Sequence, residues 1–277
     1  MTLVQGAPGI VRSSLLDAVP GLVHGFTTRE LGSMAGSLSG AEEQERNRAA
    51  LERTIGLPIV KASQVHGNDV VLLASGRATR VRDGESRPVE HASELEADAL
   101  ISRERGLALA VAVADCVPVL AVTPDGWIGI AHAGWEGTTR DVVGLMTAAI
   151  AEQGAARSDW RIAIGPSIGP CCYEIDAARA TEVRERLGRR ADRVLRPRGD
   201  RYDLDLWLAI RLRLRDAGMD VVDSLDVCAK DEVARFFSHR GEQRRAGRGL
   251  AFIGWQRGVP TLGRHDGARG EMREGSR

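Results

Sequence analysis

The strongest apolar pattern lies at the centre of the chain. Three short runs, residues 107–114 (LALAVAVA), 117–123 (VPVLAVT) and 127–131 (WIGIA), are apolar on both faces of an extended chain. Runs of this length without polar alternation predict strands that are covered on both sides. Asp115 and Pro118 interrupt the stretch and leave it too short to span a bilayer. We therefore expect a buried sheet here.

Helices and further strands surround this centre. Apolar residues at helical spacing predict three helices, at residues 138–152, 176–189 and 203–217. Thr138 or Thr139 is expected to cap the first helix, and Gly218 to end the last. Other apolar runs predict strands at residues 160–164, 221–228 and 250–255. Because several strand pairs are joined by tight turns, the pattern favours an α+β or mixed-sheet domain over a regular parallel α/β fold.

Two polar segments remain. Residues 80–97 are expected to form a surface loop, and residues 264–277 a polar tail. Neither has the character of a linker, because strong apolar segments lie on both sides of the loop and only the chain end follows the tail. We therefore expect a single domain over residues 1–277, with its core at about residues 20–255.

Composition narrows the classes of function. The chain has 277 residues, 43% hydrophobic and 27% charged, and its formal net charge is +0. A neutral chain gives no electrostatic argument for nucleic acid or an anionic membrane as its partner. The N-terminus does not have the pattern of a secretory signal. Four cysteines, two of them adjacent, therefore suggest free thiols in a reducing, cytoplasmic compartment.

Three residues with metal-binding side chains lie at predicted strand ends. His66 is in QVHG, Cys116 in ADC and His132 in AHAGW, each beside small or turn residues. Imidazole and thiolate are zinc ligands, and a three-ligand site leaves a fourth position open for water or substrate. The separations match no short zinc signature. Structural roles therefore remain an alternative, a packed thiol for the cysteine and a carbonyl hydrogen bond for each histidine.

Other polar residues also have two interpretations. Asp115 would orient a ligand histidine or act as acid or base, or else cap a turn or pair with an arginine. The loop at residues 165–172 would present backbone N–H groups to an anion or a base, or simply turn the chain. Cys171 and Cys172 are expected to pack, because neighbouring side chains of an extended chain point apart. Arg29 and Arg240 would clamp phosphate or lie on the surface.

Several sequence blocks together resemble a known family. They are HGFTTR (24–29), NR (47–48), QVHG (64–67), DALIS (98–102), GLALAVAVADCVPVLAV (106–122), IGIAHAGWEGT (128–138), AIGPSIGPCCYEI (163–175) and FFSHR (236–240). In this order they resemble the YfiH/laccase-domain family, also called peptidoglycan editing factor PgeF or polyphenol oxidase. The resemblance covers roughly residues 20–255.

The resemblance implies a layered α/β/β/α sandwich with mixed sheets, similar to a bacterial deamidase toxin. It implies Zn²⁺ held by His66, Cys116 and His132, with copper as the metal of the older laccase label. It further implies phosphorolysis of adenosine, inosine, guanosine and methylthioadenosine, adenosine deamination, and a role in peptidoglycan editing. The partners would be a purine nucleoside and phosphate, and the protein would be a monomer or homodimer. The residues expected to serve this chemistry are, as catalytic groups, Asp115, Cys116 and Arg29, and, as substrate-binding groups, Arg29, Asn47, Gly165 and Arg240.

The chain departs from the family pattern in three places. Glu136 replaces the arginine of HAGWRGT, which would weaken phosphorolysis if that arginine binds phosphate. The glycine-rich stretch after residue 29 is shortened, and FFSHRG retains Arg240 but loses the arginine beside it.

Two other enzyme classes remain open. Cys116 and His132 would form the thiolate–imidazolium pair of a hydrolase or amidase that acts on a cell-wall precursor. A multicopper oxidase needs paired histidines, and six histidines without an H-x-H pair do not provide them. Any phenol oxidation would therefore come from copper in the zinc site.

Overall fold

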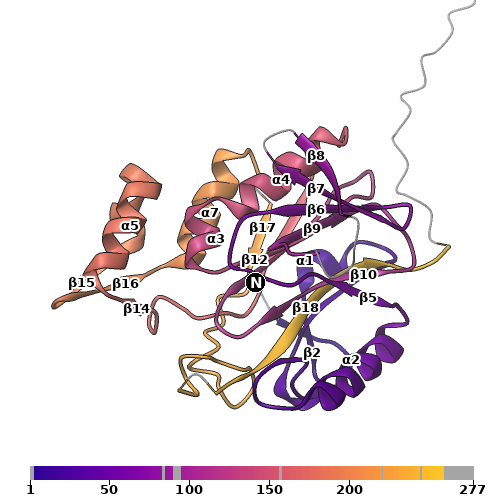
Figure 1. Ribbon diagram of the computed structural model, residues 1–277, viewed down its shortest axis with the longest axis horizontal. Helices are drawn as coiled ribbons and strands as arrows, with labels where there is room; N and C mark the ends of the chain where they lie inside the picture. Colours follow the sequence, from indigo (N-terminus) through magenta and orange to yellow (C-terminus); the bar gives the residue numbers. More distant parts are fainter. Residues whose placement is uncertain are drawn as a thin grey trace, which may run out of the picture.

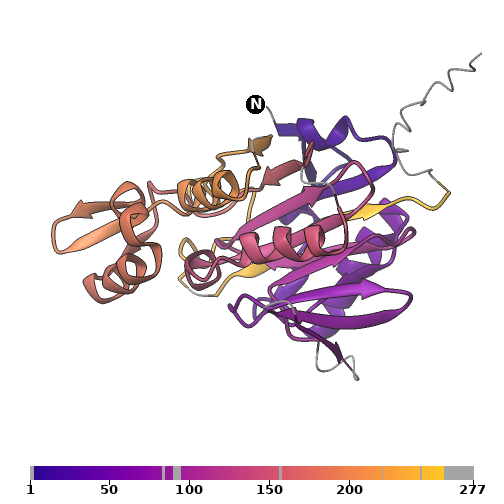
Figure 2. The ribbon, with the colours of Figure 1, turned by 90° about the horizontal axis from the view of Figure 1, so that it is seen from above.

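Two mixed β-sheets lie face to face, and helices cover both outer faces (Figures 1 and 2). The computed structural model describes residues 3–82, 85–89, 95–155, 158–219, 221–243 and 245–258. In Figure 1 the layers follow one another from α4 and α7 at the top, through the two sheets, to α2 at the bottom. The mixed α+β fold expected from the sequence is confirmed, in the α/β/β/α order that the resemblance implied.

The first sheet contains seven strands. Its path runs through β1 (Leu3–Gln5), β2 (Ile10–Ser13), β3 (Leu22–Thr27), β18 (Gly247–Trp255), β10 (Ala108–Val113) and β5 (Ile59–Lys61), and β4 (Ala35–Gly36) pairs with β18. Only the pair β10–β5 is parallel among these described strands. The C-terminal ends of β5 and β10 therefore lie at the same edge of the sandwich.

The second sheet contains eight strands. They are, in spatial order, β17 (Val222–Ser224), β13 (Arg161–Ile164), β11 (Val117–Val122), β12 (Ile128–Ala133), β9 (Ala99–Ser102), β6 (Val70–Ala74), β7 (Arg77–Arg82) and β8 (Glu85–Val89). The pairs β6–β9 and β13–β17 are parallel, and β11 and β12 form an antiparallel hairpin. A small third sheet contains β14 (Glu174–Ile175), β16 (Arg201–Leu204) and β15 (Leu195–Arg198).

Successive side chains of the central strands point to opposite faces of the sheet, and both of these faces are covered by apolar layers. In β10, Leu109 and Val111 pack between the two sheets, whereas Ala110 and Ala112 face the layer of α2. In β11, Leu120 packs between the sheets and the neighbouring valine and alanine positions face the helices on the other side. The central strands of each sheet are thus buried on both faces, as apolar runs without polar alternation predict.

The described helices cover these outer faces. They are α1 (Ser14–Asp17), η1 (Arg29–Leu31), α2 (Ala41–Ile55), α3 (Trp135–Thr139), α4 (Val142–Glu152), α5 (Ala177–Leu187), η3 (Gly188–Arg190), α6 (Ala191–Val194) and α7 (Leu206–Asp216). Side-chain caps start two of the longer ones: Asp176 accepts a hydrogen bond from the Arg179 N–H, and Asp205 one from the Leu208 N–H. No described helix is long and apolar enough to cross a membrane.

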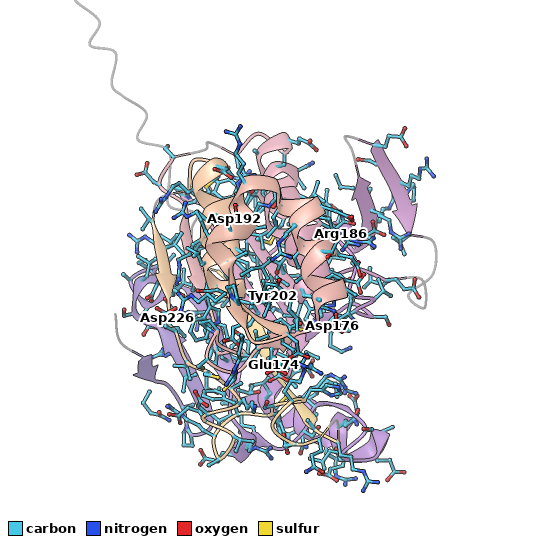
Figure 3. The ribbon with its side chains drawn as sticks, turned by 90° about the vertical axis from the view of Figure 1, so that its left-hand side faces the viewer. Glu174, Asp176, Arg186, Asp192, Tyr202 and Asp226 are labelled. Atoms are coloured by element: carbon cyan, nitrogen blue, oxygen red, sulfur yellow. The ribbon has the colours of Figure 1, made fainter. Side chains whose placement is uncertain are left out.

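A projecting unit is built from α5, α6 and the third sheet, at the left of Figure 1. Figure 3 looks at this side, with Arg186 of α5 and Asp192 of α6 near the upper end and Glu174 and Asp176 below them. Its apolar residues continue the core that lies between the second sheet and its helices.

Three expectations about local structure were wrong. The helix expected over residues 138–152 is two helices, α3 and α4, because Asp141 adopts a left-handed conformation (φ 64°) and caps α4 in place of Thr138 or Thr139. The segment expected as a loop contains most of the exposed hairpin β7–β8, whose polar composition does not indicate a buried strand. Residues 201–204 form β16 before α7 begins. Residues 90–94 of the expected loop, and the tail, lie outside the described residues.

Candidate active site

His66, Cys116 and His132 converge at one edge of the sandwich. Their ligand atoms, one from each side chain, all lie within 4.8 Å of one another. His66 follows β5 where the chain passes to the second sheet, and Cys116 joins β10 to β11 at a second crossing between the sheets. Because β5 and β10 are parallel neighbours, these two crossings lie together. His132 is brought to the same edge by its pairing opposite Pro118, close to the start of β11.

Asp98 organises two of these three side chains. Its carboxylate is fully buried and accepts a hydrogen bond from Nδ1 of His132 at 2.8 Å. It also accepts the N–H groups of Val65, His66 and Gly67 at 3.3, 3.2 and 2.6 Å. The bond to His132 places the ring proton on Nδ1 and leaves Nε2 free to bind a metal. The backbone bonds hold His66 in its unusual left-handed conformation (φ 59°).

The electrostatics of the group favour a thiolate. Burial alone raises the pKa of the Cys116 thiol, but the charges of His132 and His66 and their hydrogen bonds lower it from 9.0 to about 6. Burial likewise lowers the pKa of His132, but Cys116 and Asp98 more than offset this and raise it. The hydrogen bond with Cys116 raises the pKa of His66. A thiolate is the form of cysteine that binds metal ions, so the donor set fits zinc.

A cavity of about 560 Å³ opens beside the three residues. Its size is in the range of small-molecule sites. The lining comprises Ala35, Lys61, Gln64, His66, Ala112, Ala114, Asp115, Cys116, His132, Gly134, Trp135, Ile168, Tyr173, Leu206, His239, Arg240 and Arg248. Lys61, Arg240 and Arg248 make it basic. Burial lowers the pKa of Lys61, and the nearby charges of Arg48 and Arg248 lower it further. Such a cluster of cations suits a bound anion.

Asp115 lines this cavity but does not touch the histidine ligands. Its Oδ1 accepts from the Ser238 hydroxyl at 2.6 Å, and its Oδ2 accepts from the Arg240 N–H at 2.7 Å. Asp98, and not Asp115, orients His132, which corrects that part of the sequence interpretation. Burial raises the pKa of Asp115, although the bonds from Ser238 and Arg240 oppose the shift. A carboxyl group that tends to keep its proton is suited to acid catalysis.

The two arginines singled out in the sequence lie in different surroundings. Arg240 lines the cavity; its Nη1 donates to the Glu174 carbonyl at 2.9 Å, and its guanidinium lies 5.0 Å from the centre of the Tyr173 ring. Arg29 is not among the lining residues. Its Nε donates to the Phe236 carbonyl at 3.1 Å, and the side chain pairs with Glu242. The structure therefore brings Arg240, but not Arg29, to the cavity.

Asn47 and Gly165 also lie outside the lining. Asn47 donates from Nδ2 to the Ser33 carbonyl at 2.8 Å. The N–H of Gly165 donates to the Pro118 carbonyl at 2.9 Å and is therefore not free for substrate. A Cβ at Gly165 would overlap the Phe26 ring, so close packing requires this glycine. Glu136 of α3 pairs with Arg140 at 3.5 Å and is likewise absent from the lining.

Sequence reasoning missed Asp98 and the basic residues Lys61 and Arg248. Asp98 directly precedes the strand ALIS, all of whose residues are buried. A carboxylate at the start of a buried strand was the available signal in the sequence. Lys61 is one of only two lysines, at the end of β5, one crossing segment before His66. Arg248 lies far away in sequence, on β18, and nothing local connected it to the ligands.

Comparisons with known proteins identify the family to which the chain belongs. The profile of the family described as multi-copper polyphenol oxidoreductase laccase matches residues 23–256. The purine nucleoside phosphorylase YlmD of Geobacillus stearothermophilus is 34% identical over 252 residues, 84% of this chain and 90% of that protein. A purine nucleoside phosphorylase of Xylella fastidiosa (strain 9a5c) is 36% identical over 257 residues, 90% of this chain and 93% of that protein.

Solved structures show the same fold. The crystal structure of YlmD from Geobacillus stearothermophilus matches with a TM-score of 0.78 at 31% identity, covering 92% of this chain and 98% of that one. The structure of the Bacillus licheniformis hypothetical protein YfiH also matches with a TM-score of 0.78, at 27% identity, over 90% of this chain and 97% of that one. The chain therefore belongs to the multi-copper polyphenol oxidoreductase laccase family, whose relatives matched here include proteins named purine nucleoside phosphorylase.

Proposed function

We propose that this protein is a zinc-dependent purine nucleoside phosphorylase with adenosine deamination as a second reaction, acting in the cytoplasm. The observation that carries the proposal is the joint lining of one cavity. The histidine–cysteine–histidine group lies in the same cavity as the cations Lys61, Arg240 and Arg248. A phosphorylase needs a place for the phosphate nucleophile and an activating group beside the sugar, and the lining of this cavity supports both roles. The names of the relatives point to the same reaction.

His66, Cys116 and His132 would hold the zinc ion. When bound, zinc would act as a Lewis acid that lowers the pKa of a water molecule or polarises a substrate oxygen. The chain's own contribution is orientation: Asp98 keeps the proton on Nδ1 of His132 and supports the loop of His66. Because three protein ligands leave a position open, the donor set is of the catalytic type.

The cations would bind phosphate. Arg240 is already oriented by the Glu174 carbonyl, which lowers the entropic cost of ordering its side chain on binding. Position 136, where Glu136 stands in place of the family arginine, is not among the lining residues of the cavity, and Glu136 pairs with Arg140. Phosphate binding by Arg29 remains a prediction from the resemblance, and the cavity favours Arg240 for that role.

Asp115 would protonate the departing purine. Its pKa is raised by burial, and it lies in the same lining as Cys116 and Arg240. Cleavage of the glycosidic bond passes through an oxocarbenium-like transition state, which a proton donor to the leaving base stabilises. Trp135 and Tyr173 provide aromatic surface in the same cavity for the base.

Product analysis by mass spectrometry tests the proposal. The protein, loaded with zinc, is incubated with adenosine with and without phosphate. Free adenine and ribose 1-phosphate that appear only with phosphate support phosphorolysis, and inosine formed without phosphate supports deamination. If the zinc-loaded protein forms neither of these products, the nucleoside assignment is refuted.

A second candidate is a hydrolase or amidase that acts on a cell-wall precursor. The hydrogen-bonded series Cys116, His132 and Asp98 has the order of a nucleophile, a base and an orienting carboxylate. Chelation distinguishes the two candidates. Activity that survives complete zinc removal but is lost on thiol alkylation supports the hydrolase, and activity that is lost with zinc and with Cys116→Ala supports the metalloenzyme.

Phenol oxidation is the third activity to consider, because of the family's name. Among the described residues, two side-chain groups have metal-binding spacing, and only one of them contains histidine. We therefore assign any oxidase activity to copper bound at His66, Cys116 and His132. Oxidation by copper-free, zinc-loaded protein would contradict this assignment.

A further inference from the structure

A second group of metal-binding side chains lies away from the histidines. Cys171, Cys172, Cys228 and Asp231 each offer one ligand atom, and these four atoms all lie within 4.8 Å of one another. They come from two loops: the segment after β13 and the segment after β17. Figure 3 labels one residue of each loop. Glu174 lies two residues after Cys172, and Asp226 lies two residues before Cys228.

The backbone explains how two adjacent cysteines point to one centre. The N–H groups of Cys172 and Tyr173 both donate to the Gly169 carbonyl at 3.0 Å, so the chain turns tightly here. In such a turn successive side chains diverge far less than in a strand. The expectation that Cys171 and Cys172 only pack rested on an extended chain, and the turn removes its premise.

The second loop is curved in the same way. The Glu232 N–H donates to the Cys228 carbonyl at 2.9 Å, which forms one helical turn and places Cys228 and Asp231 on one face. Backbone bonds join the two loops, since Ser167 N–H donates to the Val227 carbonyl and Ala229 N–H donates to the Ser167 carbonyl. The four ligand atoms are therefore held together by main-chain structure.

The contacts inside the group match a cation site. The thiols of Cys171 and Cys172 donate to the two oxygens of Asp231 at 3.2 and 3.1 Å. The Gly169 N–H donates to Sγ of Cys228 at 3.3 Å, the kind of outer bond that stabilises a metal-bound thiolate. In a tetrahedral site with Zn–S bonds of about 2.3 Å, neighbouring sulfurs lie about 3.8 Å apart. The four ligand atoms lie within 4.8 Å of one another, so no pair exceeds that spacing by more than about 1 Å.

We propose that Cys171, Cys172, Cys228 and Asp231 bind a second zinc ion, which has a structural and not a catalytic role. Four protein ligands fill a tetrahedral shell, and closed shells are typical of structural zinc. Binding would displace the thiol protons to solvent, because cysteine binds zinc as the thiolate. Binding would therefore strengthen as the pH rises.

The ion would stabilise one wall of the substrate cavity. The same loop continues from Ile168, whose N–H donates to the Asp115 carbonyl at 2.8 Å, to Tyr173. Ile168 and Tyr173 both line the cavity beside Cys116 and Arg240. Loss of the second zinc should thus raise the KM for substrate more than it lowers kcat. Zinc binding here is independent of which reaction the first site performs.

Metal counting by inductively coupled plasma mass spectrometry tests the proposal. Protein purified under reducing conditions with zinc present should hold about two zinc ions per chain, in two four-coordinate sites. Cys171→Ser and Asp231→Asn should each reduce the content to about one, and Cys116→Ala should also reduce it to about one by emptying the other site. Asp200→Asn, at an exposed carboxylate in the turn between β15 and β16, is the matched control and should leave two.

A spectroscopic measurement tests the second site without substituting any of its four ligands. X-ray absorption at the zinc edge of the Cys116→Ala protein should show a shell of about three sulfurs at about 2.3 Å and one lighter ligand. One zinc in the wild-type protein with unchanged content in Cys171→Ser, or a disulfide between these cysteines under the same reducing conditions, would overturn the proposal. A zinc shell without sulfur in Cys116→Ala would also overturn it.

Discussion

Replacement of Asp98 by asparagine should weaken zinc binding at the histidine–cysteine–histidine site. The substituted amide would keep the shape of the side chain but lose its charge, and its nitrogen could donate to Nδ1 of His132. That bond would favour the tautomer with the proton on Nε2, the nitrogen that must bind the metal. The native carboxylate also accepts three backbone N–H groups around His66, so the positions of two ligands depend on it.

The expected magnitude follows from the behaviour of such orienting groups. Loss of an outer hydrogen-bond partner of a metal ligand weakens binding by about 10- to 100-fold, or roughly 1.4–2.7 kcal/mol. Competition with a chromophoric chelator measures this change directly. The control is Asp125→Asn, because the Asp125 carboxylate also accepts a hydrogen bond, at 2.6 Å from Thr123, but lies in the β11–β12 turn. Affinity of Asp98→Asn within about twofold of the wild type would refute the orienting role.

Three further predictions concern stability and substrate binding. Burial lowers the pKa of His24 from 6.5 to about 4, although Asp17 nearby opposes the shift, so the unfolded chain takes up this proton first as the pH falls. Urea unfolding should therefore show a free energy of unfolding that decreases by about 3 kcal/mol between pH 6.5 and pH 4. The same pH profile in His24→Gln would contradict this assignment. Gly165→Ala should destabilise the fold by about 1–3 kcal/mol or more in the same assay, because a Cβ would overlap the Phe26 ring. The control Gly40→Ala places its Cβ in open space and should destabilise the fold by less than about 1 kcal/mol. Equal effects of the two substitutions would exclude the close contact as the cause. Arg240→Gln should raise the KM for phosphate about tenfold or more in steady-state kinetics, and an unaffected phosphate KM would remove Arg240 from the phosphate site.

The central strands could be predicted from the sequence because their burial determines the residue pattern. Leu109, Val111 and Leu120 lie in apolar runs without polar alternation, and only a sheet covered on both faces buries all of their neighbours. The break between α3 and α4 could not be predicted in this way. Asp141 interrupts an otherwise continuous helical pattern through a left-handed backbone conformation, which no apolar spacing records.

The three candidate zinc ligands emerged from residue type, strand ends and family resemblance, but the groups around them did not. Asp98 acts through hydrogen bonds to residues more than thirty positions away, so its role depends on which strands pair. Arg248 reaches the cavity only because β18 pairs with β10. Arg29, by contrast, was favoured by its motif, yet Glu242 and Phe236 hold its side chain outside the cavity lining.

We propose that zinc at His66, Cys116 and His132 makes phosphorolysis possible. The most direct test of this proposal is a titration of metal-free protein with zinc, in which phosphate-dependent release of adenine from adenosine is measured at each addition. We predict negligible activity without zinc, a rise to a plateau in the wild-type protein, and no rise in Cys116→Ala. Full adenine release by the metal-free protein, or an equal rise in Cys116→Ala, would refute this role of zinc.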